Sequence, residues 1–332
     1  MGRAKSSALV IGAGGHVGNA IARALLAAGW TVTACGRRRT PPLNLRNLPL
    51  TYRTGDVEAP GQLDRWIDHH DLVVDAAAPY PMELIFPGVE PKQAPFAAAE
   101  VRTARIIEAI KRHDVTLVYV GSFISQVAPR TAAQRLRARL IRWTLPYFEV
   151  KELIESRLLD ASRRGLRVIL LNPTYCLGPW DLHDRRVCTI PLLLSGEIPG
   201  WITQMLNVVD VRDLAAAALR ALATERFGEP LLISGHQIST YDFYSLICRL
   251  GGVKTPRFAT SATLAMIGSY LLEMGYSVLG QQTPIITAGM MMATAIDYLE
   301  TGSALKGLGI VPRPLSETVR DAIEWYRMIG YC

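Results

Sequence analysis

The stretch Ala8-Leu-Val-Ile-Gly12-Ala-Gly-Gly15-His16-Val17-Gly18 decides the fold of this chain. Its apolar start, Ala8–Gly12, predicts a short buried strand, and the residues from His16 to Ala28 have the periodicity of a helix. Glycines between a strand and a helix let the backbone approach a pyrophosphate, and the helix N-terminus then offers free N–H groups. We therefore predict that Gly12, Gly15, His16, Val17 and Gly18 bind a dinucleotide; a purely structural glycine turn is the alternative.

Strand and helix signals alternate through the first half of the chain. Helices are expected at 97–112 and 147–164, and further buried strands at 31–35, 50–53, 71–77, 116–121 and 166–172. This alternation predicts an α/β fold, a Rossmann doubly wound parallel sheet with helices on both faces.

The rhythm changes after Pro173. The stretch 207–222 predicts a strand, a cap at Asp210 and a helix; Pro230–Ser234 predicts one more sheet strand, and a last helix is expected over 316–328. We expect residues 6–173 plus 208–234 to form the NAD(P)-binding domain. Residues 174–207 plus 235–332 would form a smaller, mostly helical substrate-binding domain.

The end of the second strand bears on cofactor choice. NAD sites usually place an acidic residue there, against the ribose 2′-hydroxyl. Here the strand ends in Cys35-Gly36-Arg37-Arg38-Arg39, which favours NADP(H), with Arg37 on the 2′-phosphate. NAD(H) stays open, and a solvated basic turn is the alternative reading.

Two further segments are candidates for the cofactor site. Asp56 either hydrogen-bonds the adenine or caps a helix after Pro60. Ala76 and Ala77 end the fourth strand, where small side chains would let the backbone pass close to the cofactor; tight packing alone is the alternative.

Tyr147 and Lys151 carry the chemistry. Their spacing puts both side chains on one face of a helix, and the lysine charge favours the phenolate, so Tyr147 can pass a proton near neutral pH. Both residues are also predicted to contact the cofactor, with Lys151 holding the nicotinamide ribose. Ser122 follows the fifth strand at the edge where ligands bind in open α/β sheets, so it is predicted to orient a carbonyl oxygen. A surface Tyr–Lys pair and a turn serine are the alternatives.

These motifs resemble the extended short-chain dehydrogenase/reductases, and within them the dihydroflavonol-4-reductase-like branch of the NAD-dependent epimerase/dehydratase family. The resemblance rests on the glycine motif, Ser122, Tyr147/Lys151, Asn172-Pro173-Thr174 and Gly178-Pro179, and it spans nearly the whole chain. It implies a Rossmann domain with a small C-terminal substrate domain. It also implies that Pro173 and Thr174 lie near the nicotinamide and that Arg37 selects NADP.

The substrate side is read from apolar and aromatic residues. Five prolines stiffen the loop 79–95, which carries Tyr80, Met82 and Phe86, and Tyr175 and Trp180 follow the sixth strand. Such side chains suit a lipophilic ligand, although methionines and aromatic residues at helical spacing also fit plain core. The arginine-rich stretch 130–142 is either an amphipathic flap that meets an anionic or membrane-borne substrate, or a solvated surface helix.

Composition narrows the classes of function and partner that remain. The net charge of +7 resides in local arginine clusters, which fits phosphate groups better than nucleic acid. The five cysteines have no pairing or zinc spacing, and there is no apolar leader or spanning segment, so we expect reduced thiols, a cytoplasmic location and no metal. A homodimer is a further expectation, and no G-x-S-x-G elbow supports a hydrolase.

The function predicted from the sequence is an NADPH-dependent reductase of a carbonyl on a lipophilic, secondary-metabolite-like substrate, with Tyr147 as proton donor. Two other functions stay open. One is a nucleotide-sugar epimerase or dehydratase that retains NAD, and the other is a non-catalytic NADP-binding regulator.

Overall fold

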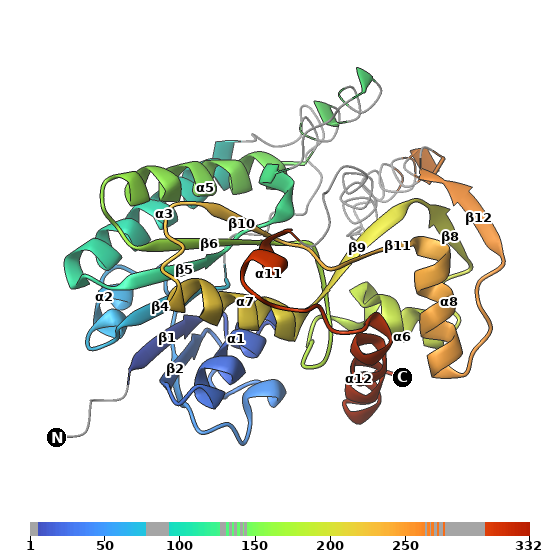
Figure 1. Cartoon of the computed structure of the whole chain (residues 1–332), viewed down its shortest axis with the longest axis horizontal. Coiled ribbons are helices and arrows are strands. Elements are labelled where there is room, and N and C mark those ends of the chain that lie inside the picture. Colours follow the sequence, from blue (N-terminus) through green and yellow to red (C-terminus); the bar gives the residue numbers. More distant parts are fainter. Residues whose placement is uncertain are drawn as a thin grey trace.

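The computed structural model describes residues 6–77, 93–126, 145–262 and 303–332, with isolated positions between 131 and 142 and between 264 and 275. A seven-stranded parallel sheet in the order β10-β6-β5-β4-β1-β2-β3 forms its centre (Figure 1). The strands are β1 Ser7–Ile11, β2 Thr31–Gly36, β3 Thr51–Thr54, β4 Leu72–Asp75, β5 Thr116–Val120, β6 Val168–Pro173 and β10 Pro230–Ile233. The predicted Rossmann α/β class is confirmed.

Helices cover both faces of this sheet. On one face α1 (His16–Ala27) packs beside α7 (Val211–Ala223), and on the other α3 (Gln93–His113) packs beside α5 (Tyr147–Arg163), near the short α2 (Gln62–Ile67) (Figure 1). Ala8 and Val10 enter the core under α1 and α7, whereas Leu9 and Ile11 enter the core under α3 and α5. Alternate side chains of β1 therefore serve two cores, as expected for a strand buried on both faces.

The strand order reverses at β1, which lies between β2 and β4. Open α/β sheets bind ligands at the carboxyl ends of the strands beside such a reversal. The fold thus places the glycine turn after β1 and the residues that follow β4 and β5 at one edge.

The residues after β6 and β10 build a second structural layer. A three-stranded sheet contains β11 (His236–Ser239), β9 (Met205–Asp210) and β7 (Tyr175–Leu177), and β12 (Phe258–Ser261) pairs with β8 (Gly200–Thr203). The helices here are α6 (Thr189–Leu194), α8 (Thr240–Gly251), α11 (Ser303–Gly307) and α12 (Leu315–Met328). The second domain was expected to be mostly helical, and the strands β7, β8, β11 and β12 were not predicted. Segments of three or four residues are too short to show a hydrophobic period.

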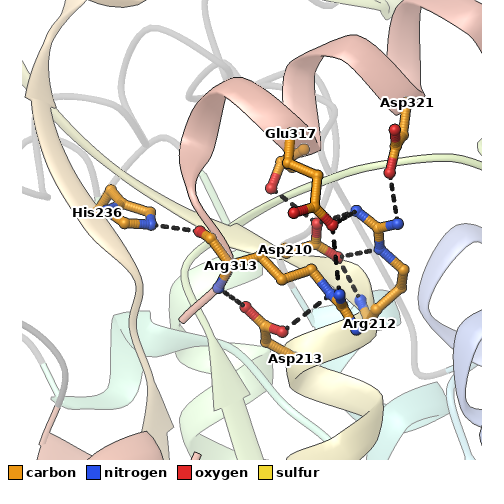
Figure 2. Close-up of polar contacts among 8 residues, drawn as sticks. Asp210, Arg212, Asp213, His236, Arg313, Glu317 and Asp321 are labelled. Atoms are coloured by element: carbon orange, nitrogen blue, oxygen red, sulfur yellow. Dashed lines mark hydrogen bonds and ion pairs between the residues drawn. The ribbon is translucent and has the colours of Figure 1, made fainter. Parts of the chain in front are cut away.

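A polar network ties α12 to the start of α7 (Figure 2). Asp210 caps α7, as predicted, by accepting the backbone N–H of Arg212, and it also accepts the Thr318 hydroxyl at 2.7 Å. The Arg212 guanidinium bridges Asp210 to Asp321, and Asp213 accepts the backbone N–H of Arg313 at 2.7 Å.

One predicted cap is wrong. Gly61, in a left-handed conformation with φ 71°, is the residue that precedes α2. Asp56 instead closes a local turn by accepting the backbone N–H of Glu58 at 3.0 Å, because it lies too far ahead of the helix to reach its free N–H groups.

Candidate active site

The glycine turn has no room for side chains. Gly12 has φ +80°, and a Cβ there would lie 2.8 Å from the carbonyl oxygen of Ala76. A Cβ on Gly18 would lie 2.2 Å from the carbonyl oxygen of Gly12, so β1 and α1 approach as closely as their backbones allow. The turn itself closes with the Gly15 N–H donating to Gly12 at 2.9 Å.

The start of α1 is suited to an anion. Gly15 provides no side-chain cap, and the first turn contains no acidic residue. Its N–H groups and helix dipole therefore remain available for a negatively charged group. His16 is buried in this turn, and no described residue pairs with its Nε2 atom. The tight glycines, the uncapped helix start and this unpaired nitrogen fit a bound dinucleotide pyrophosphate.

The edge that would meet the adenosine part is basic. The strand β2 ends at Gly36 with no acidic residue, and Cys35 before it is buried in the core, where burial raises the pKa of its thiol to about 12. Arg37 is exposed and has no hydrogen bond or ion pair to another described residue. Asp56 is exposed after β3. Ala76 and Ala77 follow β4, and the Ala76 N–H donates to Ile11 at 3.0 Å, which holds this backbone directly beneath Gly12.

The predicted catalytic pair lies on one face of α5. Tyr147 is its first residue and Lys151 follows one turn later; both are buried. The Lys151 Nζ atom is 5.7 Å from the centre of the Tyr147 ring and 5.9 Å from that of Tyr119. Burial lowers the pKa of Lys151 to about 8, with the Asp75 carboxylate opposing that effect. The pair is thus part of the interior and not a surface pair.

Ser122 is also buried, directly after β5. Its carbonyl oxygen accepts the Ser125 hydroxyl at 3.1 Å, within the short 3-10 turn η2 (Phe123–Gln126), which packs against α5. The fold thereby brings Ser122 to the same sheet edge as Tyr147 and Lys151.

Sequence reasoning missed a polar cluster one turn further along α5. Glu155 accepts the Ser125 hydroxyl at 2.6 Å and the Asn172 amide at 2.7 Å. The other amide atom, Asn172 Oδ1, has no described partner, and a Cβ on Gly121 would lie 2.2 Å from it. The cluster fixes the start of η2 and so supports Ser122.

It also missed a buried ion pair. Arg102 of α3 forms two hydrogen bonds of 2.8 Å to the Asp75 carboxylate at the end of β4. The signal was present in the sequence, because Arg102 has helical spacing with Ala99, Ile106 and Ala109 on the buried face of α3.

Sequence reasoning also missed the hydrogen bonds of Asn44, which hold the glycine turn in place. The Asn44 amide donates to Gly14 at 3.1 Å and to Trp180 at 2.9 Å. Asn19 in turn donates to the Asn44 carbonyl at 3.0 Å. These bonds connect the glycine turn with the segment after β7.

The predicted substrate residues fall in different places. Tyr80, Met82 and Phe86 lie outside the described residues. Tyr175 packs edge-on against Phe243, and its hydroxyl donates to Thr189 at 3.2 Å, which ties that phenol into the core around α8. Trp180 has φ +74° and stacks under Arg23 of α1 at 4.5 Å.

Pro173 ends β6 next to β10, and Thr174 directly follows it. The Thr174 N–H donates to Ile233 at 3.1 Å, and its hydroxyl donates to Asn207 at 2.8 Å. Both residues therefore have fixed backbones at the carboxyl edge of the sheet.

The arginine-rich stretch is described only in part. Arg135 and Arg139 are exposed, whereas Arg142 pairs with Glu152 of α5 at 2.5 Å. Among the described residues, no group of His, Cys, Asp or Glu side chains has the arrangement of a metal site. In the same part of the chain, no helix has the length and apolarity needed to cross a bilayer.

Comparison with known proteins agrees with this geometry. The chain is 23% identical over 331 residues to a putative dihydroflavonol 4-reductase of Synechocystis sp., covering 97% of this chain and 95% of the relative. It is 26% identical over 337 residues to the sterol demethylase protein B of Methylococcus capsulatus, covering 97% and 98%. The crystal structure of gox2253 superposes with a TM-score of 0.76 at 24% identity, over 98% of this chain and 99% of that one.

The family assignment follows from a family model that matches more than half of the chain. The model of the NAD dependent epimerase/dehydratase family matches residues 8–233, from β1 to the end of β10. This range contains the glycine turn, Ser122 and the Tyr147–Lys151 pair. The chain therefore belongs to the NAD dependent epimerase/dehydratase family and is an NAD(P)-dependent enzyme of the short-chain dehydrogenase/reductase type.

Proposed function

We propose that this enzyme is an NADPH-dependent reductase of a carbonyl group on a lipophilic small molecule. The observation that carries the proposal is the buried Tyr147–Lys151 pair on one face of α5, with Ser122 at the same sheet edge. A phenol beside a buried ammonium is equipped to give up a proton near neutral pH. In a surface Tyr–Lys pair, which is the alternative, both side chains would be exposed to solvent.

The proposed step is a balanced carbonyl reduction. NADPH, when bound, would supply a hydride to the carbonyl carbon and would leave as NADP+. Tyr147 donates its phenolic proton to the carbonyl oxygen, so the product is an alcohol. Lys151 stabilises the phenolate left on Tyr147, and Ser122 donates a hydrogen bond that orients the carbonyl oxygen.

The preference for NADPH is supported by the end of β2. The strand ends at Gly36 with no carboxylate to accept the ribose hydroxyl, and Arg37, the next residue, is exposed. A guanidinium pairs well with a phosphate, whereas it gives a ribose hydroxyl no comparable partner.

A lipophilic substrate is supported by the names of two relatives. The Synechocystis relative is called a putative dihydroflavonol 4-reductase, and the Methylococcus relative a sterol demethylase protein. Both names refer to bulky, largely apolar ring systems. We further propose that Tyr80, Met82, Phe86, Tyr175 and Trp180 contact this substrate, and that 174–207 plus 235–332 form its domain.

The test combines cofactor titration with two substitutions. Purified enzyme, freed of bound nucleotide, is titrated with NADPH and with NADH by fluorescence, and its turnover is screened with flavanonol and sterol ketones. We expect Tyr147→Phe to lower kcat at least about 100-fold, as expected for loss of a general acid, and to leave the Kd for NADPH unchanged. Arg37→Ser should raise the Kd for NADPH about tenfold and leave that for NADH unchanged. Retained turnover in Tyr147→Phe would exclude it as the proton donor.

The same titration separates the second candidate function. An epimerase or dehydratase that recycles its hydride retains NAD through purification and exchanges it slowly. The name of the family favours this alternative, and tightly bound NAD together with activity on a nucleotide sugar would replace our proposal.

A further inference from the structure

The Asp75–Arg102 pair is buried beside the proposed catalytic residues, and the Nε atom of Arg102 also lies 3.6 Å from the carboxylate of Glu58, which is exposed. Both guanidinium nitrogens of Arg102 lie 2.8 Å from the carboxylate. Asp75 is 0% exposed and Arg102 is 5% exposed. The backbone also holds the pair, since Ala77 donates to Asp75 at 3.2 Å and Arg102 donates to the Ala77 carbonyl at 3.3 Å.

The sheet register places this pair next to Lys151. Asp75 of β4 is the register partner of Tyr119 of β5, and paired residues of neighbouring parallel strands project to the same face. The Lys151 Nζ atom lies over the Tyr119 ring on that face, between the sheet and the layer of α3 and α5. The carboxylate, the guanidinium and the ammonium therefore share one buried layer.

Stability alone does not account for these charges. A buried ion pair is often no more stabilising than apolar side chains of similar volume. Here a third charge, the Lys151 ammonium, lies in the same layer, and burial lowers its pKa to about 8. Asp75 opposes this effect of burial, whereas Arg102 adds to it.

Among the described residues, few other charged or titratable groups face Lys151. They are the phenols of Tyr119 and Tyr147, and, further along α5, the Glu155 carboxylate. The Tyr119 hydroxyl has no hydrogen-bond partner among the described residues. Glu155 is engaged with Ser125 and Asn172. Asp75 is thus the carboxylate of this layer that acts on the ammonium.

We propose that Asp75 and Arg102 are positioning residues that set the charge of Lys151: Asp75 keeps the ammonium protonated, and Arg102 fixes the carboxylate and limits its effect. The inference rests on the proposed role of Lys151 beside Tyr147. It predicts effects of opposite sign for the two partners. Removing the carboxylate should discharge Lys151 at lower pH, and removing the guanidinium should keep it charged to higher pH.

The experiment measures the titration of Lys151 directly by NMR and indirectly through the pH dependence of turnover. Lysine side chains are labelled with ¹³C at Cε, and the resonance of Lys151 is identified by its absence in Lys151→Arg and followed by NMR from pH 6 to 11. The variants are Asp75→Asn, Arg102→Gln and the double variant, which leaves neither buried charge unpaired. The pH dependence of kcat/KM is measured on the same proteins.

We expect the midpoint for Lys151 to fall by at least one pH unit in Asp75→Asn and to rise in Arg102→Gln. The double variant should lie below the wild type but closer to it than Asp75→Asn, because Asp75 has the larger influence. Arg102→Lys, which keeps a cation, should restore the wild-type midpoint. If Asp75→Asn does not fold, the double variant against the wild type still decides the sign.

Shifts of the same sign in both single variants, or an unmoved midpoint in the double variant, would overturn the inference. The NMR arm needs no substrate, so it separates the two proposals. A wild type that titrates as expected but reduces no carbonyl would count against the proposed function alone. A wild type that reduces carbonyls while the variants show unmoved midpoints would count against the pair alone.

Discussion

Two clusters of buried charge in this enzyme are built in opposite ways. Asp75 is fully buried and has one arginine, one backbone N–H and a nearby ammonium, while Arg102 also lies 3.6 Å from the exposed carboxylate of Glu58. In the α7–α12 network, made of Asp210, Arg212, Asp213, Arg313 and Asp321, Asp210 accepts from both Arg212 and Thr318, Asp213 from Arg313, and Asp321 from Arg212 (Figure 2). Its arginine side chains also reach solvent, with Arg212 20% exposed.

The pKa directions explain what the difference means. Burial favours a protonated Asp210, but hydrogen bonds from Arg212 and Thr318 outweigh it and lower the pKa of the carboxyl, so folding favours the charge. Burial lowers the pKa of Lys151, so folding opposes that charge. The charged Asp210 therefore stabilises the fold, whereas the charged Lys151 beside Tyr147 reduces its stability and needs a functional reason.

The largest effect is expected from breaking each cluster at its arginine. Arg102→Gln leaves the fully buried Asp75 without its cation and should lower the free energy of unfolding by about 3 kcal/mol or more. The matched change, Arg212→Gln, should cost about 1 to 2 kcal/mol, because Asp210 keeps the Arg212 N–H and the Thr318 hydroxyl. Urea unfolding at pH 7.5 measures both, and a larger loss in Arg212→Gln would contradict the comparison. In Asp75→Asn/Arg102→Gln, stability should lie closer to that of the wild type.

The second largest effect is a gain of stability when Lys151 is replaced by an uncharged side chain. The pKa of Lys151 falls from 10.5 to about 8 on folding, so the unfolded chain binds more protons between these pH values. Stability attributable to this group therefore rises with pH across that window, and below it the full cost applies. Lys151→Met should stabilise the protein by about 2 to 3 kcal/mol at pH 7, while turnover is lost.

Buried thiols and phenols titrate in the same alkaline range, so the informative quantity is the difference between the two unfolding curves. That difference should shrink toward zero as the pH approaches 10.5. Lys151→Arg, which keeps a cation, serves as the control and should bring no gain. A difference that stays constant with pH would mean that Lys151 is not discharged within the protein.

The main sheet was predictable because its signals are local. Runs such as Ala8–Gly12 and Thr116–Gly121 are apolar, short and separated by helical periodicity, and each became a strand. The positions of Ser122, Tyr147 and Lys151 followed from the ends of those elements. What brought these residues to one edge is the parallel order of β1, β4 and β5.

The contacts that surround the site were harder to predict from the sequence, because they join segments that are far apart along the chain. Arg102 and Asp75 are 27 residues apart, and Asn44 reaches Trp180 across 136 residues. Each of these residues has an ordinary local meaning, as a helix arginine, a strand end or a loop amide. Only an arginine on the apolar face of α3 signalled a buried partner, and the sequence did not say which carboxylate it would meet.

The smallest effect tests the exposed rim of the α7–α12 network. Asp321 accepts from Arg212 at 2.5 Å, but its side chain is 29% exposed. Ion pairs near solvent contribute about 0 to 1 kcal/mol and are screened by salt, whereas the buried Asp75–Arg102 pair is screened much less. Asp321→Asn should therefore lower the free energy of unfolding by less than about 1 kcal/mol at low ionic strength. Raising the salt concentration to about 1 M should remove most of that loss, whereas the loss in Arg102→Gln should persist, since water and ions do not reach Asp75. If salt leaves the loss of unfolding free energy in Asp321→Asn unchanged, the ion pair at Asp321 is as shielded from ions as the Asp75–Arg102 pair. The contrast between the two clusters would then fail.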